Sequence, residues 1–189
     1  MTSIKREFQD VLDEFLVLRC QDGETEALEE LVRRWQKQLL GHAWRLTGDG
    51  NAARDIVQES WLAIAGGIRR LKDPALFNRW AYRIVSHKSA DWVRRRQRDR
   101  RLAVSVARSL DGETQAEPEP AATDDDIAAL RRAIRRLSPD HKVILSLYYF
   151  DEKGIPAIAE ILSIPAGTVK SRLYHARQHL RRRLERRPL

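Results

Sequence analysis

Polar side chains gather at the start of one predicted helix near the C-terminal end of the chain. They are Thr168, Lys170, Ser171 and Arg172. Pro165, just before them, suits the first turn of a helix because its missing N–H would have no partner there. Hydroxyls and cations at a helix N-terminus receive phosphate oxygens well. The pattern therefore predicts a surface that contacts a nucleic acid backbone.

A short apolar segment, residues 158–162, precedes that helix across the turn 163–165. Two helices joined in this way are typical of a helix-turn-helix, whose second helix enters the major groove of DNA. Val169 and Leu173 are four residues apart and are expected to anchor the second helix inward. The residues expected on its open side are Lys170, Ser171, Tyr174, His175 and Arg177.

A second candidate surface is acidic. Asp55, Gln58 and Glu59 stand at positions i, i+3 and i+4, so they share one face of a predicted helix. In a chain of net charge +8, a compact acidic and amide patch fits a docking site for a basic protein surface. An ordinary solvated helix face has the same spacing, so both interpretations remain open. The residues expected to face the core from this helix are Val57, Trp61 and Ile64.

The elements that must position these surfaces are all predicted to be helices. Apolar residues recur at helical spacing from about residue 8 to residue 101, and alternating strand patterns are absent from the sequence. Breaks are expected at 47–50, 66–67 and 73–74, where glycine, aspartate or proline gather. Asn51 is the expected N-cap of the helix that carries the acidic patch. A long helix is expected from about residue 75 to residue 98.

An acidic segment divides the chain. Residues 103–126 hold seven acidic residues against one arginine, with Pro118 and Pro120 among them. The composition predicts a flexible linker, which is either a solvated spacer or a negatively charged tether for a basic channel. We therefore expect two small helical domains, 1–101 and 127–189, joined by the linker 102–126. Within the second, Ser138 is the expected cap of a helix that begins at Pro139.

The overall composition restricts the functional class. The net charge of +8 and the isoelectric point near 10.0 indicate a polyanionic partner. A single cysteine, Cys20, excludes an internal disulfide and fits a reducing compartment. The sequence holds neither a signal-peptide pattern nor an apolar run of about 18 residues. We expect a cytoplasmic protein that does not insert into membranes.

Catalytic and metal-binding patterns are weak. His175 and His179 are four residues apart, but no neighbouring third ligand accompanies them. The sequence has no glycine-rich phosphate loop, nucleophile elbow or paired catalytic acid. We predict that the protein is not an enzyme, acts by binding, and needs neither a cofactor nor a metal ion.

Three motifs together resemble a known family. Asp55-x-x-Gln58-Glu59, after a glycine-aspartate turn, resembles the core-polymerase-binding helix of bacterial sigma factors. Residues 77–84, with Asp91 and Arg94 beyond them, resemble the helix of those proteins that melts promoters and reads the −10 element. The third motif resembles the −35-reading domain of sigma factors and comprises residues 137–139, 143–145, 167–173 and 176–177. The order of the motifs, the short linker and the lack of a third domain resemble the extracytoplasmic-function (ECF) subgroup of the sigma-70 family.

The resemblance implies an alternative sigma factor with three kinds of contact. Core RNA polymerase would be bound by Asp55, Gln58 and Glu59. The −10 element would be held as a single strand, with one extruded base near the loop 66–75, by Trp80, Arg83, His87, Lys88, Arg94 and Arg95. The duplex −35 element would be read by Thr168, Lys170, Ser171, Arg172, Tyr174, His175 and Arg177. An anti-sigma factor is a further implied partner.

Aromatic residues on the long helix have two interpretations. Trp80, Tyr82 and Trp92 are candidates for stacking on exposed bases. Aromatic residues on an amphipathic helix are more often core residues, so the packing interpretation stays open beside the stacking one.

The chain departs from the family pattern at three positions. His87 stands where the family usually has asparagine, close to the pocket for the extruded base, and His175 stands where it often has arginine. Histidine makes fewer hydrogen bonds than a bidentate arginine, so family habit does not give the promoter sequence. Ala157 replaces a usual acidic residue, and we expect only a local packing effect.

Two other functions fit parts of the sequence. A stand-alone helix-turn-helix regulator that binds duplex operators would explain the second domain but would leave the acidic patch and the first domain unused. A scaffold or inhibitor that binds polymerase without reading DNA is disfavoured by the segment 167–177.

Overall fold

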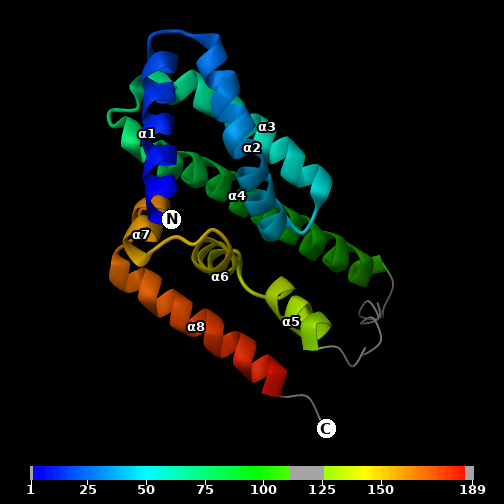
Figure 1. Ribbon diagram of the computed structural model, residues 1–189. Coiled ribbons are helices and arrows are strands. Elements are labelled where there is room, and N and C mark those ends of the chain that lie inside the picture. Colours follow the sequence, from blue (N-terminus) through cyan, green and yellow to red (C-terminus); the bar gives the residue numbers. More distant parts are fainter. Residues whose placement is uncertain (1, 111–125, 186–189) are drawn as a thin grey trace.

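The computed structural model describes residues 2–110 and 126–185, and every regular element within those ranges is helical (Figure 1). The first range, here the N-terminal lobe, holds α1 (Thr2–Gln21), α2 (Thr25–Thr47), α3 (Gly50–Gly67), the short turns η1 (Ile68–Arg70) and η2 (Pro74–Leu76), and α4 (Phe77–Leu110). The second, here the C-terminal lobe, holds α5 (Asp126–Arg135), α6 (Pro139–Leu145), the π turn η3 (Ser146–Phe150), α7 (Ile155–Leu162) and α8 (Ala166–Glu185). The all-helical prediction is confirmed.

The N-terminal lobe is built around α2, which packs against α1, α3 and α4. Apolar residues from each of these helices meet in its core because their 3.6-residue period keeps them on one face. The fully buried ones include Val17, Leu31, Leu39, Ile64 and Phe77. This core fixes the faces of α3 and α4 that point outward.

The N-cap of helix α3 lies two residues before the predicted one. Asp49, not Asn51, is the N-cap: its carboxylate Oδ1 accepts hydrogen bonds from the backbone N–H groups of Asn51 and Ala52, at 3.0 and 3.1 Å. Gly48 just before it has φ 68°, a left-handed conformation that glycine adopts without steric cost. The cap prediction at Asn51 was wrong because the carboxylate of Asp49, two residues earlier, accepts the N–H groups of the first turn.

Helix α4 continues to Leu110, about a dozen residues past the predicted end near Arg98. It therefore enters the segment interpreted as linker. The sequence between 99 and 110 contains neither glycine nor proline, and its arginine, leucine and alanine residues are good helix formers. Acidic residues and prolines begin only after this point, and most of the predicted linker lies outside the described residues.

The C-terminal lobe packs α8 across α5, α6 and α7. Ser138 caps α6 as predicted, since its Oγ accepts a hydrogen bond from the N–H of His141 at 3.4 Å. The turn between α7 and α8 passes through Ser163, whose φ of 54° lies in the left-handed region. Val169 and Leu173 are buried, which confirms the inward face predicted for α8.

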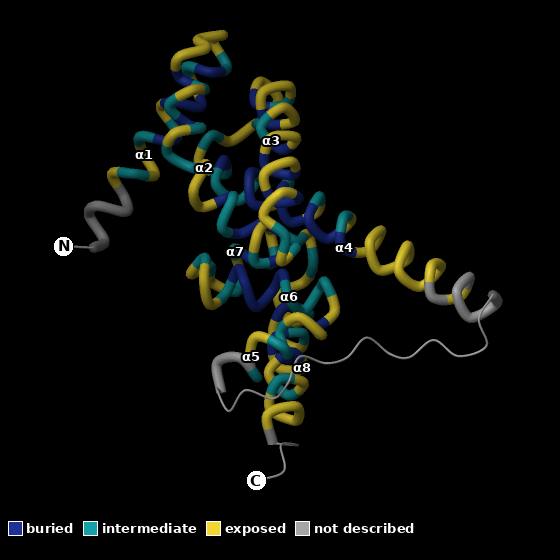
Figure 2. Tube along the Cα trace, turned by 90° about the vertical axis from the view of Figure 1, so that its right-hand side faces the viewer, coloured by how far each residue is buried: buried dark blue, intermediate teal, exposed yellow. Residues whose placement is uncertain are grey.

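The two lobes pack against each other. Helix α4 contacts α6 and α7, and α2 contacts α6 and η3 (Figure 2). Buried residues of both lobes form one continuous apolar cluster that includes Val85 of α4 and Ile158 of α7. Within the described residues, no helix is both long enough and apolar enough to cross a lipid bilayer.

Candidate protein and nucleic-acid interfaces

Helix α3 displays the predicted acidic patch. Asp55, Gln58 and Glu59 are all exposed on one face, while Ile56 and Val57 on the opposite face are buried. The shared face was therefore predicted correctly from spacing. Among the described elements, α3 packs against α2, α4 and η1 of its own lobe, which leaves the patch open to a partner.

Two neighbours of the patch were missed by the sequence analysis. Leu62 lies one turn beyond Gln58 and Glu59 on the same face, and 70% of its surface is exposed. An exposed leucine beside carboxylates gives a partner an apolar contact within a polar surface. On another side, Lys88 of α4 donates a hydrogen bond to the Glu59 carboxylate at 2.9 Å. The spacing of Leu62 could have revealed the first, but the second joins two separate helices.

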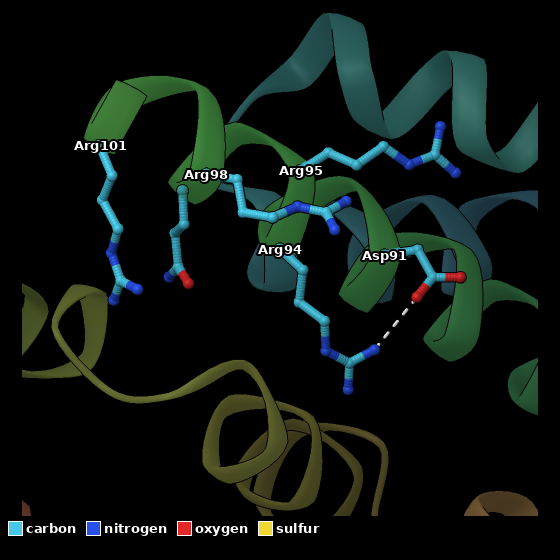
Figure 3. Close-up of a pocket in the computed structure, with 6 residues that line it drawn as sticks. Asp91, Arg94, Arg95, Arg98 and Arg101 are labelled. Carbon is cyan, nitrogen blue, oxygen red and sulfur yellow. Dashed lines mark hydrogen bonds and ion pairs between the residues drawn. The ribbon is translucent and has the colours of Figure 1, made fainter. Parts of the chain in front are cut away.

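Helix α4 carries a row of cations. Arg83 and His87 are exposed, and Lys88 is partly exposed. Farther along, a hollow of about 430 Å³ is lined by polar and charged side chains of one helix (Figure 3). Its lining residues are Asp91, Arg94, Arg95, Gln97, Arg98 and Arg101. Arg94 is the one whose position is fixed within this group, by an ion pair with Asp91 at 3.1 Å.

This hollow extends the predicted cationic face. Arg94 and Arg95 were expected there, but Arg101 was not, because the helix was predicted to end near residue 98. The planar guanidinium group matches the geometry of a phosphate, and contacts with phosphates carry no base preference by themselves. The arrangement can therefore hold a polyanionic strand along α4.

The aromatic residues of α4 differ in burial. Tyr82 is 2% exposed, and its hydroxyl donates to Asp151 of the other lobe at 3.2 Å, so the stacking interpretation was wrong for it. Trp80 is half-buried, and a Cβ on Gly67 would lie 2.9 Å from its ring, so glycine makes room for the indole. Trp92 is half-buried too, with the Arg96 guanidinium 5.1 Å from its ring centre. Trp80 and Trp92 retain an exposed edge.

Helix α8 presents the predicted open face. Its exposed residues are Lys170, Ser171, Tyr174, His175 and Arg177. Thr168 and Arg172 are half-buried, and Arg172 forms an ion pair with Asp140 of α6 at 3.5 Å. Arg177 donates a hydrogen bond to the hydroxyl of Tyr149 at 2.9 Å. Hydroxyl, amine, imidazole and phenol groups thus stand side by side on a convex helix surface.

Two histidines of this lobe lie close together. His141 and His179 have ring centres 5.8 Å apart. Burial lowers the pKa of His141, and the neighbouring His179 lowers it further. Among the residues that the structure describes, no three His, Cys, Asp or Glu side chains are grouped to hold a metal ion.

Comparison with known proteins decides the family. The family model for sigma-70 region 2 matches residues 31–99, and the model for sigma-70 region 4 matches residues 127–180. Together they span well over half of the chain. The chain belongs to the sigma-70 family.

Full-length relatives place this sigma factor within its family. It is 27% identical over 177 residues to the ECF RNA polymerase sigma factor SigW of Bacillus subtilis, covering 89% of this chain and 94% of that protein. It is 28% identical over 181 residues to the RNA polymerase sigma-H factor of Pseudomonas aeruginosa, covering 92% and 94%. The chain is an alternative sigma factor of the ECF group, and sigma factors are in general transcription initiation factors rather than enzymes.

Solved structures share the fold. CnrH in complex with the cytosolic domain of CnrY superposes with a TM-score of 0.69 at 20% identity, covering 92% of this chain and 97% of CnrH. RpoE of Bartonella quintana, in complex with the anti-sigma factor NepR, gives 0.61 at 20% identity, covering 85% and 98%.

This sigma factor also has a buried polar cluster between its lobes, which the sequence analysis did not find. Asp151 follows η3 in the C-terminal lobe, and its side chain is 4% exposed. Its Oδ2 lies 2.7 Å from Nδ1 of the fully buried His42, and its Oδ1 forms an ion pair with Arg45. We call the set the inter-lobe cluster: His42, Arg45, Tyr82, Ser86, Ser146 and Asp151.

The remaining hydrogen bonds of the inter-lobe cluster involve the hydroxyl groups of two serines. Nε2 of His42 lies 2.9 Å from Oγ of Ser86, and Arg45 Nε donates to Oγ of Ser146 at 2.9 Å. Since Asp151 only accepts, His42 donates through Nδ1–H and accepts from the Ser86 hydroxyl through Nε2. Each buried polar side chain of the inter-lobe cluster therefore has a hydrogen-bond partner within the protein, as buried polar groups require.

Ionisation in the inter-lobe cluster follows from its burial and charges. Burial lowers the pKa of His42, more than the nearby Asp151 carboxylate raises it. Burial alone would raise the pKa of Asp151, but the hydrogen bond from His42 and the charge of Arg45 hold it below its usual range. At neutral pH the cluster is therefore a neutral histidine beside an Asp151–Arg45 ion pair.

Proposed function

We propose that this sigma factor binds core RNA polymerase through α3 and directs it to promoters through two separate DNA-binding faces, on α4 and α8. The observation that carries the proposal is the coexistence of an exposed acidic face on α3 with exposed cationic faces on α4 and α8. A protein that only bound duplex DNA would not need the first of these surfaces.

The polymerase contact is assigned to Asp55, Gln58, Glu59 and Leu62. The two carboxylates are suited to arginine side chains, which form bidentate bonds with carboxylates. Leu62 adds an apolar anchor, and anchors of this kind contribute much of the energy of protein interfaces. Polymerase arginines would replace Lys88 as the partner of Glu59.

The −10 element is assigned to α4 as a separated single strand. Separating bases costs about a few kcal/mol per step, and capture of the strand must offset this cost. The half-buried Trp80 is held in place by the space that Gly67 leaves, and its exposed edge suits contact with an unstacked base. Phosphates would be held by Arg83, Lys88, Arg94 and Arg95, with His87 beside the base.

The −35 element is assigned to α8 as duplex DNA. Lys170, Ser171, Tyr174 and His175 are exposed on the face opposite the buried Val169 and Leu173, so they would enter the major groove together. Thr168, Arg172 and Arg177 lie at the sides of this face, where phosphates pass. Because His175 makes fewer hydrogen bonds than arginine, base preference at its position is expected to be weaker.

An anti-sigma factor is proposed as a regulatory partner. RpoE of Bartonella quintana, which shares this fold, was solved in complex with the anti-sigma factor NepR. For this chain we further propose that it has no enzymatic activity of its own, so that the chemistry of RNA synthesis belongs to the polymerase.

The test is run-off transcription with purified bacterial core polymerase, this protein and a library of genomic promoter fragments. Initiation at a small set of sites that depends on the added protein is the expected result. Duplex binding to operators without any association with core polymerase would instead identify a stand-alone regulator. A Lys170→Ala variant is the matched control, since it should lose promoter activity while still associating with core polymerase.

A further inference from the structure

We propose that Asp151 is the clasp of a closed, self-inhibited state, in which the C-terminal lobe is held on the N-terminal lobe and must be released before both promoter elements are read. The effect on promoter reading rests on the proposed function, whereas the closure itself is argued from the inter-lobe cluster alone.

Asp151 concentrates the contacts that cross between the lobes. Three groups of the N-terminal lobe reach its carboxylate: the imidazole of His42 at 2.7 Å, the hydroxyl of Tyr82 at 3.2 Å, and the guanidinium of Arg45. Only 4% of its side chain is exposed, so the carboxylate depends on these partners for its hydrogen bonds. Removing one member of such a buried pair leaves the other charge without compensation, so the arrangement depends on Asp151.

The turn before Asp151 aims it across the interface. Residues Ser146–Phe150 form a π turn, in which the N–H of Asp151 bonds to the carbonyl of Ser146 at 3.0 Å. This wider turn brings residues five apart onto the same side, and Oγ of Ser146 lies 3.3 Å from Oδ2 of Asp151. Both side chains therefore point at α2, where Arg45 bonds to each of them.

The other polar contacts between the lobes are more exposed. Ion pairs between exposed side chains contribute little to stability because water and salt screen them. These contacts are Arg79 with Glu160, Lys153 with Asn78 at 2.8 Å, and Arg94 with Asp140 at 3.1 Å. Lys153 also lies 4.6 Å from the ring centre of Tyr82, whereas the inter-lobe cluster holds the most buried carboxylate among these contacts.

The closed arrangement is incompatible with reading two distant DNA elements. The carboxylate of Asp140 forms ion pairs with Arg94 of α4 at 3.1 Å and with Arg172 of α8 at 3.5 Å. A residue assigned to the −10 element and one assigned to the −35 element therefore contact the same side chain. Elements labelled −10 and −35 are about 25 base pairs apart, which at 3.4 Å per pair is on the order of 80 Å. The lobes must separate to reach both.

Core polymerase binding does not require this separation. The patch on α3 is exposed while the lobes are closed. We therefore expect loss of the clasp to change promoter engagement much more than core association. This difference separates a clasp from a residue that only stabilises the fold.

The first experiment measures the separation of the lobes in the full chain by single-molecule fluorescence energy transfer. Dyes are placed at Gln38→Cys and Arg183→Cys in a Cys20→Ala background, two exposed positions on α2 and α8. Asp151→Asn should raise the ratio of open to closed molecules about tenfold or more. The matched control is Glu29→Gln, an exposed acid of α2 outside the inter-lobe cluster, which should leave the ratio unchanged.

A transfer distribution for Asp151→Asn that equals the wild type overturns the clasp. Circular dichroism and thermal unfolding establish that the variant is folded. If Asp151→Asn does not fold, Arg45→Gln removes the same ion pair from the other lobe at a position that is 23% exposed, and the same rise in open molecules is required of it.

The second experiment compares promoter-complex formation by core polymerase with wild-type protein and with Asp151→Asn. Faster complex formation at equal core affinity supports self-inhibition, and equal or slower formation by an opened variant overturns it. If even the wild-type protein gives no initiation, the proposed function fails, while the fluorescence experiment still decides whether Asp151 closes the molecule.

Discussion

The patch on α3 and the inter-lobe cluster use the same kinds of residue in opposite surroundings. Asp55 and Glu59 are carboxylates in water, and Glu59 has a single surface partner, Lys88. Asp151 is a carboxylate out of water, with partners on both of its oxygens. Burial, rather than residue type, therefore decides whether a carboxylate is available to another protein or holds two parts of its own chain together.

The largest effect is expected from reversing the charge of the exposed patch. Asp55→Arg with Glu59→Arg should weaken core polymerase binding at least about 30-fold, because two charge-assisted contacts become repulsive. The helical content should not change, since neither side chain is part of the core. Binding is measured by fluorescence anisotropy and folding by circular dichroism. Glu29→Arg is the control. If the double variant binds core polymerase as tightly as the wild-type protein does, α3 is not the polymerase-binding surface.

A smaller effect, on stability, is expected from Ser86→Ala in the inter-lobe cluster. The change leaves Nε2 of the buried His42 without its donor, which costs about 1–3 kcal/mol. A thermal scan should show the midpoint lowered by several degrees, with core binding intact. A midpoint within about one degree of the wild type would mean that water replaces the hydroxyl and that the cluster is less dry than its burial indicates.

Acidification should open the molecule. The pKa of His42 is lowered in the closed state and returns toward its ordinary 6.5 when the lobes separate. The open state therefore binds more protons. The contribution of His42 to the closed state is complete above pH 6.5 and decreases as the pH falls below that value. The groups facing His42 come from both lobes: Asp151, Ser146, Ser86, Tyr82, Arg45 and Lys153.

The depressed pKa of Asp151 acts in the same direction at still lower pH, because the open state again binds the extra proton. The measurement is the open fraction by energy transfer between pH 8 and pH 5.5. The His42→Gln variant should show a flatter profile over this range. A profile that is flat in the wild-type protein would contradict the neutral histidine assigned to the closed state.

The smallest effect is expected from the surface ion pair. Lys88→Ala removes the partner of Glu59, and because both side chains are substantially exposed the change in unfolding free energy should stay below about 1 kcal/mol. Urea unfolding measures it. A loss as large as that of Ser86→Ala would erase the distinction between the exposed and the buried carboxylates.

Local patterns made much of this molecule predictable from sequence. The faces of α3 and α8 follow from residues three and four apart, and the burial of Val57, Ile64, Val169 and Leu173 agrees with that spacing. Each of these inferences needs only the geometry of one helix. The end of α4 was misplaced because residues 99–110, which contain neither glycine nor proline, continue the helix up to the acidic segment.

The inter-lobe cluster was not predictable in the same way. His42 and Asp151 are 109 residues apart, and nothing near either one indicates the other. His42 lies within an apolar stripe of α2, where a polar residue gives no hint of its partner. Tyr82 fits a stacking role on sequence alone, since its contact with Asp151 depends on how the two lobes pack.

The five-residue π turn Ser146–Phe150 has a consequence for how such proteins diverge. One residue of a helix corresponds to a rotation of about 100°, so deleting a single residue there would swing the carboxylate of Asp151 away from α2. The same deletion would also move Leu147, a fully buried residue of the turn, out of its place in the apolar core of the lobe. The length of this turn therefore couples the packing of the C-terminal lobe to its polar contact with the other lobe, so that insertions and deletions are expected to be rarer here than in the turn between α1 and α2.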